Sequence, residues 1–167
     1  MGTKEHKKHA PKFIKIGIIT LSSTRTLQDD ISGHWIKRQA IKEGFLVVLH
    51  QIIPDDSSMI SQAVLEAIAD HQPQALLLTG GTGISSKDVT IEAIAPLFKK
   101  VLTSFGSIFA QLSYEEIDSA AILSRATAGV IGKTIVFAMP GSLPACKLAC
   151  KSLIFPELGH LVVHIQD

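Results

Sequence analysis

The stretch from Gln74 to Ala93 constrains the fold of this chain more than any other. Residues 75–78 form a short continuous apolar run, which is typical of a buried parallel strand. A glycine-rich turn at residues 80–83 follows at once, and polar residues then lead to Thr90, which we predict to be the N-cap of a helix. Such a loop lies at the carboxyl edge of a parallel sheet, where main-chain amides and helix N-termini suit anionic groups, above all phosphate.

Two interpretations of this turn stay open on the residues alone, a tight connection or a phosphate cradle. The chain lacks the GxGxxG and GxxxxGK(S/T) patterns, so the two standard nucleotide-binding fingerprints are absent. Aromatic residues make up only 5% of the chain, which argues against a generic domain that stacks a flavin ring on aromatic side chains.

Two more strand–helix units precede this stretch. A β-branched apolar run at residues 13–21 predicts the first strand, and helical periodicity predicts a helix from Ser32 to Glu43. Residues 45–53 predict the second strand, which a helix follows near residues 59–70. Three such units in a row predict an α/β fold, with a mostly parallel sheet and right-handed crossovers.

The second half of the chain gives weaker signals. An edge strand is expected at residues 101–102, and residues 126–130 and 134–139 predict a hairpin. The last helix follows Pro144 and is predicted to end at Phe155-Pro156. An apolar stripe at helical spacing lies between the expected edge strand and the hairpin, and it is either core packing or a subunit interface. It comprises Phe105, Ile108, Phe109 and Leu112.

Length and charge bound the class of protein. The 167 residues fit one domain at residues 13–167, after a basic tail at residues 1–12 that we expect to be disordered. Four lysines and one glutamate give this tail a charge of +3, which leaves −2 for the rest of a chain whose net charge is +1. The tail either touches an anionic partner or is a solvated leader, and by charge the body is not a nucleic-acid-binding surface.

No membrane or secretory segment is expected. No window reaches the roughly 18 uncharged apolar residues of a membrane span, and no apolar region follows the basic N-terminus before Phe13. The expected location is therefore cytoplasmic.

The two cysteines, Cys146 and Cys150, are spaced four residues apart on the last predicted helix. We expect them to share one face as small buried groups. The alternative is a Cys/His metal site that also uses His160 and His164.

Polar loops follow four of the predicted strands, and in a parallel sheet all of them lie at the same edge. They are Ser22–Arg25, Pro54–Ser58, Gly80–Asp88 and Pro140–Ser142. Asp55 and Asp88 are then expected to converge on one cleft lined by main-chain amides. Two carboxylates beside a phosphate cradle suggest a bound Mg²⁺, which suits phosphoryl or nucleotidyl transfer.

Each charged residue near these loops also has a purely structural interpretation. Asp55 precedes a predicted helix and suits its cap, and Asp88 lies where a negative charge favours the dipole of the next helix. Arg125 either binds an anion or pairs with Glu115 or Glu116.

The longer motifs around these loops resemble those of a known family. TGGTG at residues 79–83, KDVT at residues 87–90 and MPGS at residues 139–142 resemble the signature of the MoaB/MogA family of molybdenum cofactor biosynthesis proteins. The likeness extends from about residue 13 to residue 154. LSYEEI, SRATAG and FAMPGS are closer to the MoaB branch, whereas Ile91 stands where the family often has a proline at the helix start.

The resemblance implies a three-layer α/β/α domain that forms homotrimers or homohexamers. Active members adenylylate molybdopterin with ATP and Mg²⁺, and by motif position Asp55 and Asp88 are implied as the catalytic and metal-binding residues. The implied substrate-binding residues are Ser22, Thr79, Gly80, Gly81, Thr82, Gly83, Pro140, Gly141 and Ser142. Because some MoaB-type proteins lack activity, the alternative is a non-catalytic molybdopterin-binding or scaffold protein.

Overall fold

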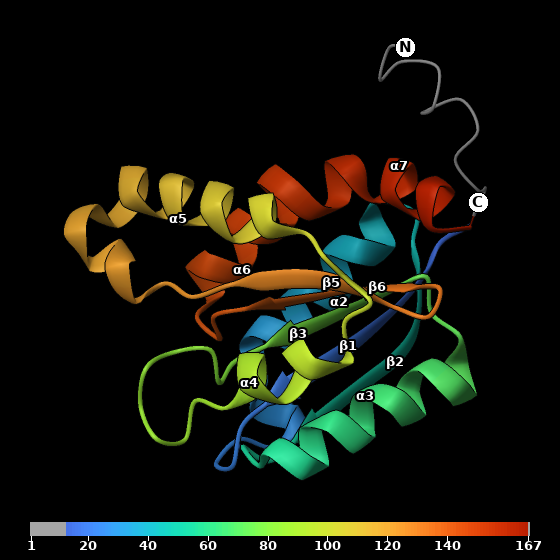
Figure 1. Ribbon diagram of the computed structural model, residues 1–167, viewed down its shortest axis with the longest axis horizontal. Coiled ribbons are helices and arrows are strands. Elements are labelled where there is room, and N and C mark those ends of the chain that lie inside the picture. The colour runs from blue at the N-terminus through green and yellow to red at the C-terminus, as the bar shows by residue number, and fades with distance from the viewer. Residues whose placement is uncertain (1–12, 167) are drawn as a thin grey trace.

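The computed structural model describes residues 13–166, so the predicted tail at residues 1–12 lies outside the described part. A six-stranded sheet runs through the centre in the order β2-β1-β3-β6-β5-β4 (Figure 1). The first four of these strands are parallel to one another, and β5 and β4 continue the sheet antiparallel. Their bounds are β1 Lys15–Leu21, β2 Leu46–Ile53, β3 Ala75–Thr79, β4 Lys100–Val101, β5 Thr127–Ile131 and β6 Thr134–Met139.

Helices cover both faces of this sheet, so the predicted three-layer α/β/α architecture with a mostly parallel sheet is confirmed (Figure 1). On one face lie α2 (Ile31–Lys42), α5 (Thr103–Ile117), α6 (Leu143–Ala149) and α7 (Phe155–Gln166). On the other face lie α3 (Ser57–His71) and α4 (Thr90–Ile94). Short 3-10 segments occupy Leu27–Asp29, Ala95–Leu97 and Asp118–Leu123.

The burial of the central strands explains why helices cover both faces of this sheet. Strand β3 is buried over its whole length, as is β6, and both carry the apolar residues that two-sided coverage requires. Two buried clusters form, one on each face of the sheet. The apolar stripe on α5 is divided between core and surface, because Phe105 and Phe109 are buried whereas Ile108 is 44% exposed.

The last helix does not end where the sequence predicted. It continues through Phe155-Pro156, because a π-turn at Cys150–Ile154 joins α6 directly to α7. The Phe155 N–H donates to the Cys150 carbonyl, five residues back. Pro156 has no N–H to donate, and this wider turn gives its ring room that a regular α-turn would not.

The resulting helix, Leu143–Gln166, is the one helix among the described residues that is long and apolar enough to cross a membrane by length and composition. Its apolar side packs into the core, where Cys146, Cys150, Ile154 and Leu158 are each 0% exposed. Of the most apolar 18-residue stretch of this helix, 39% is buried in the folded chain.

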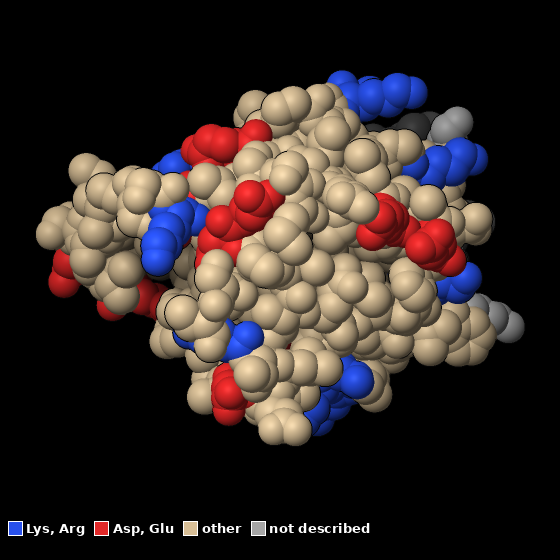
Figure 2. Space-filling view, turned by 90° about the horizontal axis from the view of Figure 1, so that it is seen from below, with Lys and Arg blue, Asp and Glu red and all other residues tan. Residues whose placement is uncertain are grey.

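The surface seen from below Figure 1 carries mixed charge. Figure 2 shows lysine, arginine, aspartate and glutamate side chains scattered among mostly uncharged residues, and no charge of one sign dominates this face. Charged residues are only 19% of the chain, which agrees with this picture.

Candidate active site

The loops after β1, β3 and β6 are in direct contact at the carboxyl edge of the sheet. A Cβ placed on Gly80 would lie 2.4 Å from the Leu21 carbonyl oxygen, and one placed on Gly141 would lie 3.1 Å from Gly80 Cα. The Gly80 amide also donates to the Met139 carbonyl at 3.0 Å. The prediction that these polar loops share one edge is therefore confirmed for these three of the four.

The glycine turn itself is closed by Thr90. Gly80 and Gly81 have φ of +103° and +63°, which favours glycine at both positions. The Thr90 hydroxyl donates to the Gly80 carbonyl at 2.8 Å, and its amide donates to the Gly81 carbonyl at 2.9 Å. The prediction that Thr90 caps α4 is wrong, since it is the first residue of the helix and its buried hydroxyl holds the turn instead.

Asp55 connects three loops. Its Oδ2 accepts hydrogen bonds from the Ser23 amide at 2.8 Å and from the Ser23 hydroxyl at 2.9 Å. Its Oδ1 lies 3.3 Å from the position of a Cβ on Gly81, so the carboxylate faces the glycine turn. The capping alternative is wrong for Asp55, because Asp56 caps α3 by accepting the Met59 amide at 2.9 Å.

Asp88 lies at the other end of the same turn. Its Oδ2 accepts the Ser85 amide at 2.9 Å and lies 2.7 Å from the position of a Cβ on Gly83. Hydrogen bonds from Ser85 lower the pKa of this carboxyl, and the nearby Arg125 charge lowers it further. Gly81 and Gly83 are two residues apart, so their Cα atoms are at most about 7 Å from each other. Both carboxylates therefore border one short turn.

Arg125 holds this loop from the outside. Its guanidinium donates to the Gly83 carbonyl at 2.9 Å and forms an ion pair with Glu92. The hydrogen bond from Arg125 to Glu92 lowers the pKa of the Glu92 carboxyl. The alternative that Arg125 pairs with Glu115 or Glu116 is wrong, because its guanidinium pairs with Glu92 instead.

The implied substrate-binding residues divide into supporting and accessible positions. The side chains of Thr79 and Thr82 are buried, and the Thr79 hydroxyl donates to the Pro140 carbonyl at 3.1 Å. Contact with a ligand at these two positions would therefore use the main chain. The other implied residues line the accessible side of the loops at this edge of the sheet or pack between these loops. They are Ser22, Gly80, Gly81, Gly83, Pro140, Gly141 and Ser142.

A cavity of about 200 Å³ adjoins the loop after β6. Pro140, Ser142 and Ser124 contribute to its lining. Ser142 also caps α6, accepting the Ala145 amide at 3.4 Å.

Sequence reasoning missed one buried acid beneath these loops. Asp30 is 0% exposed and is the N-cap of α2, which begins at Ile31 rather than at the predicted Ser32. The signal was an aspartate directly before the helical periodicity, in a position where that residue type is a strong cap.

The cysteines are buried, as predicted. Burial raises the pKa of the Cys146 thiol and raises that of Cys150 well above its ordinary value. Residues 13–166 contain no group of three or more His, Cys, Asp or Glu side chains that could hold a metal ion, so the Cys/His metal site finds no support.

Comparison with known proteins decides the family. Residues 17–160 match the model described as "Probable molybdopterin binding domain". The chain belongs to the MoaB/MogA family of molybdenum cofactor biosynthesis proteins. The predicted resemblance is thereby confirmed.

Relatives of this family carry two different names. The chain is 48% identical over 167 residues to molybdenum cofactor biosynthesis protein B of Bacillus subtilis, covering 99% of this chain and 98% of the relative. It is 42% identical over 173 residues to the molybdopterin adenylyltransferase of Pyrococcus furiosus, with both chains fully covered. A crystal structure of a molybdenum cofactor biosynthesis protein B superimposes with a TM-score of 0.91 at 43% identity, covering 95% of this chain and 99% of that one.

Proposed function

We propose that this protein acts in molybdenum cofactor biosynthesis and adenylylates molybdopterin with ATP. A phosphate oxygen of molybdopterin attacks the α-phosphorus of ATP. The bond between that phosphorus and the oxygen that bridges it to the β-phosphorus breaks, and pyrophosphate leaves. The observation that supports this most is the placement of Asp55 and Asp88 at the two ends of one glycine turn. The name of the Pyrococcus furiosus relative points to the same reaction.

In this proposal the glycine turn binds the pterin phosphate. The amides of residues 81 and 82 supply hydrogen-bond donors, and the half-buried Ser22, Pro140 and Gly141 border the same space. The role of the turn is to fix the attacking oxygen relative to the α-phosphorus, since phosphoryl-type transfers depend mainly on positioning and charge stabilisation.

The donor set at this turn fits Mg²⁺. Magnesium typically uses one or two carboxylates together with substrate phosphate oxygens and water. Asp55 and Asp88 would hold it, because Asp55 keeps Oδ2 for Ser23 and presents Oδ1 toward Gly81. When bound, the ion would neutralise phosphate charge that two carboxylates would otherwise repel.

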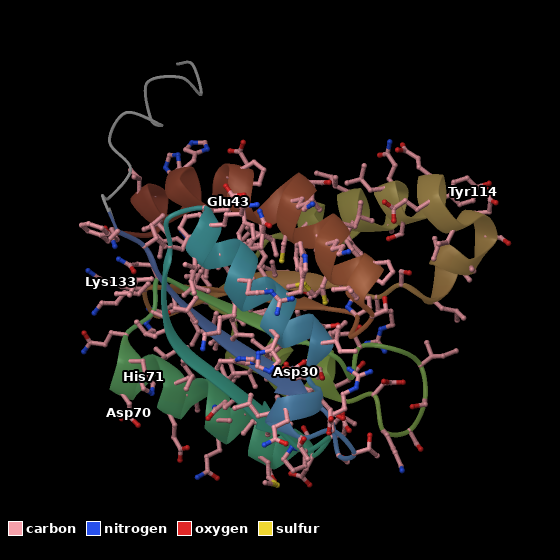
Figure 3. The ribbon with its side chains drawn as sticks, turned by 180° about the vertical axis from the view of Figure 1, so that it is seen from behind. Asp30, Glu43, Asp70, His71, Tyr114 and Lys133 are labelled. Atoms are coloured by element: carbon pink, nitrogen blue, oxygen red, sulfur yellow. The ribbon has the colours of Figure 1, made fainter. Side chains whose placement is uncertain are left out.

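The test is Asp88→Asn, with Asp70→Asn as the matched control. Asp70 is exposed near the end of α3, and the view in Figure 3 shows it at the end of the molecule away from Asp30. Adenylyl-molybdopterin and pyrophosphate are measured with ATP, molybdopterin and Mg²⁺. We expect Asp88→Asn to lower turnover by about 100-fold or more while the control keeps parental turnover. Equal rates for Asp88→Asn and the parent would remove Asp88 from the reaction.

A second candidate function is binding of molybdopterin without catalysis. The observation that favours it is that both carboxylates already accept hydrogen bonds, Asp55 from Ser23 and Asp88 from Ser85. Such bonds also suit acids that only shape their loops. Tight binding of molybdopterin with no pyrophosphate released from ATP would favour this candidate.

We also propose that the protein acts in the cytoplasm as a homo-oligomer, a trimer or hexamer. Large apolar side chains are exposed on α5 and on the 3-10 segment after it. Tyr114 lies near the end of α5 that projects from the molecule in Figure 3. Exposed apolar groups gathered in this way favour a subunit contact. They are Ile108, Tyr114, Ile117, Ile122 and Leu123. Light scattering of the purified protein tests this, and a monomer would contradict it.

A further inference from the structure

One carboxylate joins the start of α2 to two neighbouring strands beneath the loop cluster. Asp30 Oδ1 accepts the Gly33 amide at 2.9 Å. Its Oδ2 accepts the Thr20 hydroxyl of β1 at 2.6 Å and lies 2.9 Å from Nε2 of His50 on β2. Figure 3 shows Asp30 at the start of α2, within the body of the molecule.

The buried Asp30 carboxyl is ionised at neutral pH, and the space around it is filled. Burial raises the pKa of the Asp30 carboxyl, but hydrogen bonds from Thr20, His50 and Gly33 outweigh burial and hold that pKa below its ordinary value. Because an ionised carboxylate only accepts hydrogen bonds, we assign a proton to Nε2 of His50. A Cβ on Gly33 would lie 2.0 Å from Asp30 Oδ2 and 2.5 Å from His50 Nε2, so no larger side chain fits there.

The bond between Thr20 and Asp30 closes a loop of the candidate site at its base. These two residues flank residues 21–29, which comprise the last residue of β1 and most of the connection to α2. That connection contains Ser23, whose amide and hydroxyl hold the Asp55 carboxylate. The position of Asp55 therefore depends on a loop whose two ends Asp30 ties together.

The same helix start also supports the loop after β6. The Ser32 hydroxyl, in the first turn of α2, donates to the Gly141 carbonyl at 2.8 Å. Gly141 in turn packs against Gly80 of the glycine turn. Fixing the start of α2 therefore acts on both loops that border the turn.

We propose that Asp30 is a positioning residue for the adenylyl transfer: by closing the base of residues 21–29 and fixing the start of α2, its carboxylate holds Asp55 and Gly141 against the glycine turn. This inference rests on the proposed function. Asp30 touches no substrate in it, and all of its effect passes through the loops above.

Three variants test this inference. Asp30→Asn keeps the size of the side chain but removes its charge and places an amide opposite two donors. His50→Gln keeps a donor at a similar reach, whereas His50→Leu has a similar size and no donor. The histidine pair keeps the test decisive even where Asp30→Asn lowers the yield of folded protein.

The readouts are turnover per folded molecule and amide hydrogen exchange. We expect Asp30→Asn and His50→Leu to lower kcat by about 10- to 100-fold, as a misplacement near 1 Å does, with His50→Gln near the parent. Exchange should become faster at residues 22–25 and 141–142 and stay unchanged at Gly44, which lies in a separate turn after α2. A parental kcat for Asp30→Asn and His50→Leu, or unchanged exchange in both loops, would overturn the inference.

Failure of the proposed function gives a different result. A parent protein that binds molybdopterin but releases no pyrophosphate would overturn the adenylyl transfer alone. The effect of Asp30 is then read from the affinity for molybdopterin, which should fall about 10-fold in Asp30→Asn and His50→Leu. Parental affinity in both variants would overturn the positioning role as well.

Discussion

Two kinds of aspartate lie at the same edge of the sheet and differ in their burial and in the source of their hydrogen bonds. Asp30 is fully buried, and its three hydrogen-bond partners come from β1, β2 and α2. Asp55 and Asp88 are half-buried at the rim, and Asp88 takes its hydrogen bonds from its own loop. Residue type alone therefore does not assign a role here. The buried acid holds elements together, and the rim acids stay accessible to a ligand.

The largest effect that this comparison predicts is on turnover at the rim. Asp55→Asn should lower the rate of adenylyl-molybdopterin formation by about 100- to 1,000-fold, because it removes a charge placed against the glycine turn. Its unfolding free energy should change by less than about 1 kcal/mol, since the amide oxygen still accepts from Ser23. Turnover and urea unfolding measured on one preparation check both parts. A large stability loss with parental turnover would reverse the roles.

The next largest effect is on stability below the rim. Asp30→Asn should lower the unfolding free energy by about 1–3 kcal/mol, because it leaves buried donors without an ionised acceptor. Asp70→Asn, an exposed acid-to-amide change on α3, is the control and should stay near the parent. Urea unfolding measures the difference, and equal midpoints for the two variants would contradict the structural role of Asp30.

The pH dependence sharpens the same contrast. The folded-state pKa of Asp30 lies below the ordinary value of 3.8, so its contribution to stability is fully present above that pH and is lost as pH falls through the folded pKa. The stability difference between the parent and Asp30→Asn should therefore shrink as the pH falls below 3.8. Urea unfolding at a series of acidic pH values checks this. A difference that grows with acid would contradict it.

The smallest predicted effect concerns the exposed pair between Arg125 and Glu92. Glu92→Gln should change the unfolding free energy by less than about 1 kcal/mol, because both side chains are solvent-screened. Arg125 keeps its bond to the Gly83 carbonyl in this variant. Thermal unfolding with and without added salt measures the effect, and a loss of several kcal/mol would show that this pair is a major anchor of the loop.

Much of the fold was predictable because it follows from strand burial. The apolar runs that became β1, β2 and β3 each ended in a polar loop, and parallel pairing places such loops at one edge. The sequence also predicted the hairpin of β5 and β6 and the short edge strand β4, and the structure contains both. For these elements the local pattern and the tertiary structure agree.

The remaining features depend on contacts that a linear pattern does not carry. Pro156 predicted a helix end, but a π-turn accommodates its ring while buried apolar residues on both sides keep the helix in place. Thr90 looked like a cap, but its hydroxyl has a partner ten residues earlier in the glycine turn. Asp30 was missed because Thr20 and His50, which explain its burial, lie on two different strands.

Pyrophosphate release by the purified protein with ATP and Mg²⁺, measured with and without molybdopterin, distinguishes adenylyl transfer from binding alone. We predict release that requires molybdopterin and that matches the adenylyl-molybdopterin formed, one for one. Tight binding of molybdopterin with no pyrophosphate above the background without protein would contradict adenylyl transfer and leave a binding protein of the same fold.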